Sequence, residues 1–175
     1  MNEQPTRWVA ETSASQQRDQ QTQLLAQLSS LTEGESFAIS HLSNAASLLW
    51  HTLPGLNWVG FYLRRGNELI LGPFMGRPAC LRIPLGRGVC GTAAALDQVQ
   101  RVPDVHAFPG HIACDSASNS EIVVPMRQNG QVIAVLDIDS PYLDRFSQED
   151  EAFLTAFADK LCEACDFSQP LITLD

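Results

Sequence analysis

The chain has 175 residues and a formal net charge of −9, from 20 acidic and 11 basic side chains. This length corresponds to one domain with or without an arm, and it buries enough surface to fold without disulfides or metals. The acidic balance argues against nucleic acid and anionic lipid as partners, because both require a basic face. No apolar stretch approaches the about 20 residues of a membrane-spanning helix, so no membrane association is expected. The first residues lack the features of a signal peptide, which favours a cytoplasmic location.

Two helices are predicted in the first third of the chain. Residues 1–23 are polar and rich in glutamine, so we expect a frayed N-terminal arm there. Leucines at helical spacing then predict a helix from Leu24, and a second apolar stripe runs from Ala38 to Leu53. Pro54-Gly55 ends the second stripe, and both helices are expected to pack against a sheet.

Strand patterns dominate the middle of the chain. Trp58 and Tyr62 alternate with Val59, Phe61 and Leu63, so the first strand is apolar on both faces and should be covered on both. Further strands are predicted at Glu68–Leu71, Cys80–Ile83, Gln100–Val102, Glu121–Arg127 and Gln131–Asp139, with a short helix at Val89–Leu96 and a long irregular run from Pro103 to Asn119.

The last predicted element is a helix that begins at Ser147, where a capping serine precedes two acidic side chains. Helices, strands, a small helix, strands and a final helix in this order predict an α+β fold with an antiparallel sheet. We expect residues 24–167 to form a single domain and residues 168–175 to form a C-terminal tail.

The five cysteines divide into two groups. Cys162 and Cys165 continue the apolar stripe of the last helix, and this position favours core packing over a redox C-x-x-C motif. The other three are Cys80, Cys90 and Cys114. A zinc site made of these three and a histidine is disfavoured, because their spacing lacks the usual close cysteine pair.

The segment around Cys80 and Cys90 contains three arginines and no acid between Gly76 and Leu96. Cys90 is predicted to lie in the first turn of a short helix. Helix N-termini and nearby cations stabilise thiolates, so we expect a lowered pKa for Cys90. Cys114 lies in a polar irregular loop near His106 and His111, which favours a reactive thiol over core packing.

Carboxylates gather at one end of the predicted hairpin. Strand alternation places Ile133, Val135, Asp137 and Asp139 on one face, which begins apolar and ends acidic. Such a face suits a small ligand with an ammonium group and an apolar side chain. The register of Glu121 is open: a two-residue Asn129-Gly130 turn pairs it with Ile138, whereas a three-residue turn or a bulge places it opposite Asp137.

Several linked motifs are similar to those of one family. They are Asn57-Trp-Val-Gly-Phe-Tyr62, Leu71-Gly-Pro-Phe74, Cys80-Leu-Arg-Ile-Pro84, Gly86-Arg-Gly-Val-Cys-Gly91, the run from Asp104 to Asp115, Ser118-Asn-Ser-Glu121 and Val135-Leu-Asp-Ile-Asp-Ser140. Together they resemble the GAF-domain free methionine-(R)-sulfoxide reductases, from about Leu24 to Phe157.

The resemblance implies a GAF-like fold, with a largely antiparallel central sheet, helices on one face and a ligand pocket on the other. It implies an oxidoreductase that reduces free methionine sulfoxide through a cysteine sulfenic acid and an intramolecular disulfide, with a thioredoxin-type reductant and no cofactor or metal. By position, Cys114 matches the nucleophile, Cys80 the resolving thiol and Cys90 a second exchanging thiol. Glu121, Asp137 and Asp139 match the pocket carboxylates, and Trp58 and Tyr62 match its aromatic wall.

The competing hypothesis is a GAF module that senses a small molecule without catalysis, since a fold alone does not determine function. The sequence leaves open which of Cys80 and Cys90 resolves first, which carboxylate is the acid, and the oligomeric state, a homodimer included. Backbone amides of residues 111–118 are a further candidate partner for the substrate carboxylate.

Overall fold

The computed structural model describes residues 6–9, 13–112 and 116–168. Within this part of the chain, six strands form one sheet in the order β3-β2-β1-β6-β5-β4, and each neighbouring pair is antiparallel. The strands are β1 (Trp58–Arg65), β2 (Glu68–Gly76), β3 (Arg82–Pro84), β4 (Gln100–Val102), β5 (Ser120–Gln128) and β6 (Gln131–Ser140). The predicted α+β class is confirmed.

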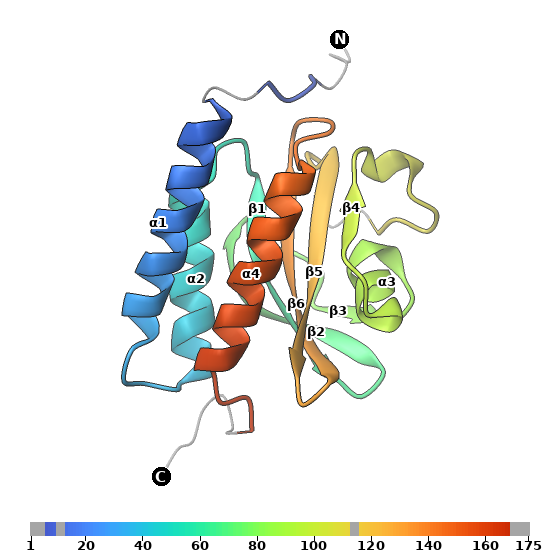
Figure 1. Cartoon of the computed structure of the whole chain (residues 1–175). Helices are drawn as coiled ribbons and strands as arrows, with labels where there is room; N and C mark the ends of the chain where they lie inside the picture. Colours follow the sequence, from blue (N-terminus) through green and yellow to red (C-terminus); the bar gives the residue numbers. More distant parts are fainter. Residues whose placement is uncertain (1–5, 10–12, 113–115, 169–175) are drawn as a thin grey trace.

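Helices cover the sheet on both faces (Figure 1). The helices are α1 (Ala14–Thr32), α2 (Ala38–Thr52), α3 (Gly88–Leu96) and α4 (Gln148–Ala164), with a 3-10 turn η1 at Val105–Ala107. The larger buried cluster joins α1, α2 and α4 to one face of the sheet. The smaller cluster joins α3 to the opposite face. None of the described helices is long and apolar enough to cross a membrane.

Strand β1 supplies both clusters, as its alternation predicted. Val59 and Phe61 lie in the larger cluster beneath the three long helices. Trp58 and Tyr62 lie in the smaller cluster on the side of α3. Because β1 is a central strand, this alternation orients Trp58 and Tyr62 toward the face where the site lies.

Helix α1 begins earlier than the leucine pattern predicted. It starts at Ala14, where Ser13 and Gln16 form a capping box. The glutamine-rich stretch before Leu24 is therefore helical in the described residues, which agrees with the good helix propensity of glutamine and alanine. Helix α4 begins as predicted, with Ser147 as the N-cap and Asp150 closing a second capping box.

A bulge gives the β5–β6 hairpin a register that differs from both predicted registers. The Asn129-Gly130 turn pairs Gln128 with Gln131, but the ladder shifts by one residue after Arg127. Ile133 is the extra residue, and it packs against the larger cluster rather than on the face of Val135. As a result Glu121 pairs with Asp139, neither with Ile138 nor with Asp137. The bulge returns Glu121 to the face of the two aspartates.

The chain before β3 is also irregular where a strand was predicted. Strand β3 begins at Arg82, so Cys80 lies in the loop that precedes it. Two side chains of β1 hold this loop: Trp58 Nε1 donates to Arg77 O at 3.1 Å, and Tyr62 OH donates to Cys80 O at 3.0 Å. The loop therefore rests on the aromatic side chains beneath it.

Candidate active site

A cavity opens on the face of the sheet that carries α3. Its empty volume is about 510 Å³, part of it open to solvent. Six of the eight predicted site residues line it: Trp58, Tyr62, Cys90, Glu121, Asp137 and Asp139. Cys80 is not among the described lining residues, although its neighbour Ala79 is. Cys114, the predicted nucleophile, lies outside the described residues.

Strand ends and one helix start supply the polar side chains. Asp137 and Asp139 come from the end of β6, and Glu121 comes from the start of β5 directly beside it. Cys90 is the third residue of α3, and its thiol lies beside the carboxylates of Glu121 and Asp137. Cys90, Glu121 and Asp137 are each at most 6% exposed, and their ligating atoms all lie within 4.8 Å of one another.

The three groups are close enough to change one another's pKa values. Cys90 Sγ donates to Glu121 Oε1 at 3.8 Å. Burial raises the pKa of Glu121 well above its ordinary value, and the charges of Asp137 and Asp139 raise it further. Burial also raises the pKa of Asp137, to about 6, and hydrogen bonds with Cys90 and Glu121 limit that rise. The cluster therefore combines a Glu121 whose pKa lies well above its ordinary value with an Asp137 whose pKa is about 6.

The lowered pKa predicted for Cys90 is wrong. Burial raises the pKa of the Cys90 thiol well above its ordinary value, and Asp137 and Glu121 act in the same direction. Cys90 does lie near the start of α3, as predicted. Desolvation and two nearby carboxylates outweigh the helix N-terminus.

An aromatic wall closes the apolar side of the cavity. The Trp58 and Tyr62 rings stack with centroids 5.9 Å apart, and Phe74 stacks on Trp58 at 5.4 Å. Gly60 lies between them on β1, and a Cβ there would come within 2.6 Å of both the Trp58 ring and the Phe74 side chain. The glycine therefore allows the three rings to pack closely.

Several polar residues of the site were missed or only partly anticipated from the sequence. His111 and Ser118 line the cavity, and Ser118 Oγ accepts a hydrogen bond from Asn57 Nδ2 at 3.0 Å. Burial lowers the pKa of His111, and nearby His106 lowers it further. Asn57 and Ser118 each begin one of the motifs that resemble the reductase family, and this position was the sequence feature that could have identified them as site residues.

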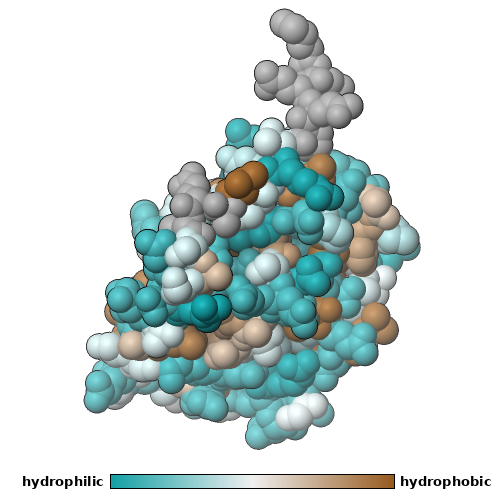
Figure 2. Space-filling model, turned by 45° about the horizontal axis from the view of Figure 1, so that its top comes forward, coloured by the Kyte–Doolittle hydropathy of each residue, from teal (hydrophilic) through white to brown (hydrophobic). Residues whose placement is uncertain are grey.

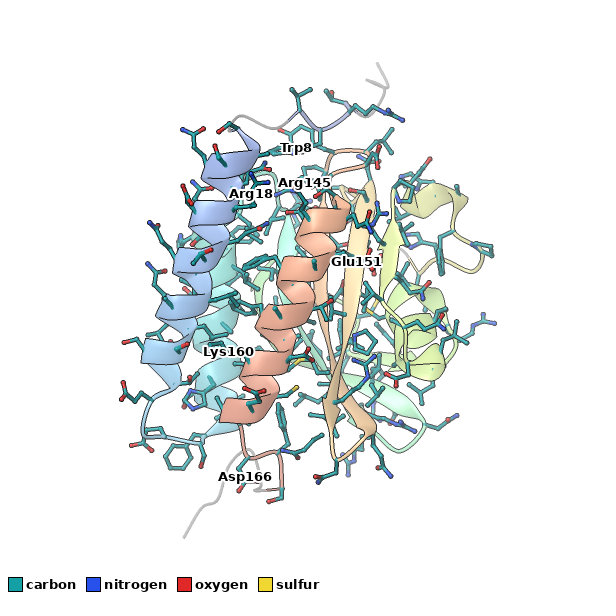
Figure 3. The ribbon with its side chains drawn as sticks, in the orientation of Figure 1. Trp8, Arg18, Arg145, Glu151, Lys160 and Asp166 are labelled. Atoms are coloured by element: carbon teal, nitrogen blue, oxygen red, sulfur yellow. The ribbon has the colours of Figure 1, made fainter. Side chains whose placement is uncertain are left out.

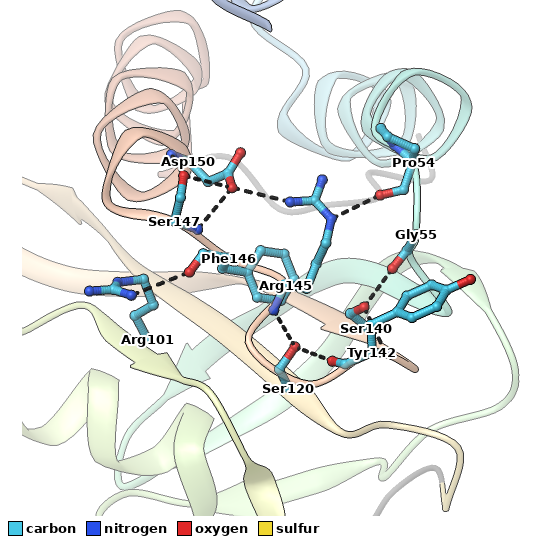
Figure 4. A network of polar contacts seen from close by, with 10 residues as sticks. All are labelled: Pro54, Gly55, Arg101, Ser120, Ser140, Tyr142, Arg145, Phe146, Ser147 and Asp150. Carbon is cyan, nitrogen blue, oxygen red and sulfur yellow. Dashed lines mark hydrogen bonds and ion pairs between the residues drawn. The ribbon is translucent and has the colours of Figure 1, made fainter. Parts of the chain in front are cut away.

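A polar network supports the strand ends from the opposite side (Figure 4). Ser120 and Ser140, which neighbour Glu121 and Asp139, are completely buried. Ser120 Oγ donates to Tyr142 O at 2.7 Å and accepts from Arg145 N at 3.3 Å. Ser140 Oγ donates to Gly55 O at 2.6 Å. These bonds fix the backbone that carries the cavity carboxylates.

Arg145 is the centre of that network. Its guanidinium donates to Pro54 O at 3.0 Å and to Asp150 Oδ2 at 3.1 Å, which joins the end of α2 to the start of α4. The ring of Trp8 covers it at 4.5 Å, and Figure 3 shows the two side chains together at the start of α4. Figure 2, turned toward this end, shows a largely hydrophilic surface with small apolar areas.

Replacing Arg145 with methionine is expected to lower the free energy of unfolding by about 3 kcal/mol, because it leaves Pro54 O and Asp150 without their buried partner. Urea unfolding followed by circular dichroism measures the change. Arg18→Met is the matched control, since Arg18 pairs with Glu149 at 3.7 Å on the exposed surface of the same helix start; it should cost less than about 1 kcal/mol. Equal losses in both variants would contradict a special role for Arg145.

The remaining cysteines lie on the other side of the sheet. Cys165 is buried in the larger cluster, and Cys162 packs against it. Both are free thiols, so the predicted core packing is confirmed. Burial raises their pKa values to about 11 for Cys162 and about 12 for Cys165. Cys80, in contrast, is disulfide-bonded.

Comparisons with known proteins define the class to which this fold and its cavity belong. The GAF domain family model matches residues 22–164, so the chain belongs to the GAF-domain family. The free methionine-R-sulfoxide reductase of Escherichia coli is 57% identical over 121 residues, which are 69% of this chain and 73% of that protein. Protein YtsP of Bacillus subtilis is 53% identical over 89% of this chain and 96% of its own.

The similarity extends to a solved three-dimensional structure. The free methionine-R-sulfoxide reductase from Neisseria meningitidis, described in complex with its substrate, superposes with a TM-score of 0.82. The two are 42% identical, and the match covers 89% of this chain and 94% of the other. The predicted GAF fold is therefore confirmed.

Proposed function

We propose that this protein reduces free methionine (R)-sulfoxide to methionine. One observation carries the proposal: Glu121, Asp137 and Asp139 meet beside the stacked Trp58 and Tyr62 rings in one cavity. Carboxylates suit the substrate ammonium, and the aromatic wall suits its methyl-sulfur end. The relatives named free methionine-R-sulfoxide reductase support the same substrate.

The proposed first step is attack by the Cys114 thiolate on the sulfoxide sulfur. The oxygen takes a proton from a cavity carboxyl, and Glu121 suits that task because its raised pKa keeps it protonated near neutral pH. Oxygen is transferred to the Cys114 sulfur as a sulfenic acid, and methionine leaves with the sulfur lone pair restored.

The proposed second step regenerates the enzyme. The Cys80 thiol attacks the sulfenic sulfur, water leaves, and a disulfide joins Cys80 to Cys114. A thioredoxin-type dithiol then reduces this disulfide and is itself oxidised. The disulfide-bonded state of Cys80 agrees with a resolving role, and Cys90 is a free thiol in the same cavity.

Selectivity for the free amino acid follows from the buried carboxylates. Asp137 is 6% exposed and ionises near pH 6, so it carries a negative charge at neutral pH in a cavity whose described lining contains no lysine or arginine. A free α-ammonium compensates this charge, whereas an acylated amine leaves it unpaired. A methionine sulfoxide inside a protein chain is therefore a poor substrate.

The test is methionine release by the purified protein with dithiothreitol or thioredoxin as the reductant. We expect turnover of free L-methionine (R)-sulfoxide and at least about 100-fold lower kcat/KM for the (S) diastereomer and for N-acetylmethionine sulfoxide. Absence of methionine release with both reductants, together with tight binding of a nucleotide, would instead establish the sensing module.

A further inference from the structure

The buried cluster of Cys90, Glu121 and Asp137 has the composition of a metal site. A thiol sulfur and two carboxylate oxygens are ligands of Zn²⁺, and a protein site with three ligands keeps a fourth position open. The ligating atoms all lie within 4.8 Å of one another. Cys90 Sγ and Glu121 Oε1 are 3.8 Å apart, close to the about 3.5 Å edge that tetrahedral Zn–S and Zn–O bonds define.

A second observation indicates that the cluster is prepared for a cation. Asp137 is 6% exposed. Cys90 and Glu121 hydrogen-bond with its carboxylate, but one of its two oxygens, Oδ1, has no partner among the described residues. An oxygen buried in this way is costly unless a ligand or ion satisfies it. His111 is the only basic side chain among the described lining residues of the cavity. The cavity therefore has negative charge to compensate and little cationic side chain to do so.

We propose that Cys90, Glu121 and Asp137 bind one Zn²⁺ ion, and that the ion excludes the substrate from the cavity. Zinc is favoured over Mg²⁺ and Ca²⁺ because those hard cations prefer sites made only of oxygen. Binding releases protons from Cys90 and Glu121, since a ligating thiol must be ionised. Zinc in this role is an inhibitor and not a cofactor, so the protein switches between a metal-bound inactive form and a metal-free active form.

Zinc should exclude the substrate because the metal ion and the substrate ammonium occupy the same position. The proposed substrate ammonium needs the same Asp137 and the same cavity as the metal ion. Two cations in contact in a buried site repel each other, and the ion also displaces the proton that Glu121 donates in the proposed reaction. The competition rests on the proposed function, whereas the binding of zinc does not.

The experiment uses the whole protein, reduced and freed of metal, and titrates it with Co²⁺ as a spectroscopic substitute for Zn²⁺. We expect the charge-transfer band of a cobalt–thiolate bond, saturating at one ion per chain and displaced by Zn²⁺. Cys90→Ser should abolish the band, and Glu121→Gln should weaken zinc binding by about tenfold or more. A band that persists in Cys90→Ser would overturn the assignment.

Two controls separate a built site from general charge attraction. Asp139→Asn removes a carboxylate of the same cavity that is not part of the triad, and it should keep the zinc affinity within about threefold. The double variant Cys162→Ser/Cys165→Ser should keep the cobalt band. Equal weakening by Asp139→Asn and Glu121→Gln would show an adventitious cation attracted by net charge, and would overturn the proposal.

Inhibition is tested last, with methionine as the competing ligand. Zn²⁺ should raise the Kd for methionine in proportion to its concentration, and Mg²⁺ should not. Simultaneous binding of zinc and methionine would overturn the exclusion. Zinc binding without any turnover of sulfoxide by the metal-free protein would contradict the proposed function alone, so the two failures are distinguishable.

Discussion

Replacing Cys114 with serine is expected to lower the reduction of free methionine sulfoxide by at least about 10³-fold. A hydroxyl neither attacks the sulfoxide sulfur nor takes its oxygen in the way a thiolate does. The structure leaves few substitutes for this thiol: Cys90 has a strongly raised pKa, and Cys162 and Cys165 lie on the opposite side of the sheet. Steady-state methionine release measures the effect.

The matched control is Cys80→Ser in a single turnover without reductant. We expect this variant to release about one methionine per chain and to accumulate a sulfenic acid that dimedone traps, because only the resolving step is blocked. Mapping of the disulfide in the wild-type protein after one turnover completes the test. Normal activity of Cys114→Ser, or a first disulfide that joins Cys90 instead of Cys80, would contradict the proposed order of the thiols.

Replacing Glu121 with glutamine is expected to lower kcat by about 10² to 10⁴-fold, the range that a positioned general acid contributes. Glutamine keeps the shape of the side chain and lacks the acidic proton. The variant should remain folded. Glu121 is a carboxyl whose pKa is higher in the folded protein than in the unfolded chain. Such a group stabilises the protein at low pH, and this contribution is lost as pH rises from the unfolded-state pKa through the folded-state pKa. Thermal unfolding at pH 8 should therefore show Glu121→Gln to be at least as stable as wild type.

Asp137 provides the contrast to Glu121. Its pKa of about 6 means that it is neutral below that pH and anionic above it. The affinity for methionine, which has the ammonium but no reactive sulfoxide, should rise as pH increases through about 6. Asp137→Asn should lose this pH dependence, whereas Glu121→Gln should change kcat more than methionine binding. Titration of tryptophan fluorescence with methionine at several pH values measures the affinity of each variant. An unchanged pH dependence in Asp137→Asn would mean that another group causes it.

Much of the fold was predictable because the decisive signals are local. The alternation of Trp58 and Tyr62 with Val59 and Phe61 indicated a strand covered on both sides, and both clusters are present. Likewise Ser147 marked the start of the last helix. The lining of the cavity by Cys90 and the three carboxylates followed from linked motifs, which combine information from distant parts of the chain.

The errors have a common physical origin, which is that they depend on contacts between distant segments. The sequence around Cys90 is basic, but its nearest charged neighbours come from β5 and β6 and are acidic. The register of Glu121 depends on a bulge at Ile133, and no residue type in that stretch signals a bulge. Arg145 was missed because a buried arginine is recognisable only when Trp8, Pro54 and Asp150 are brought around it.

Cys162 and Cys165 lie on the face of the sheet opposite the cavity, and this position affects which thiols can exchange with a disulfide. With pKa values of about 11 and about 12, roughly one thiol in 10⁴ and one in 10⁵ is ionised at pH 7. Thiol–disulfide exchange needs the ionised form, so these two sulfurs are kinetically silent. In the proposed mechanism, oxidising equivalents that enter at the cavity therefore stay on that side, and two of the five cysteines take no part in disulfide exchange.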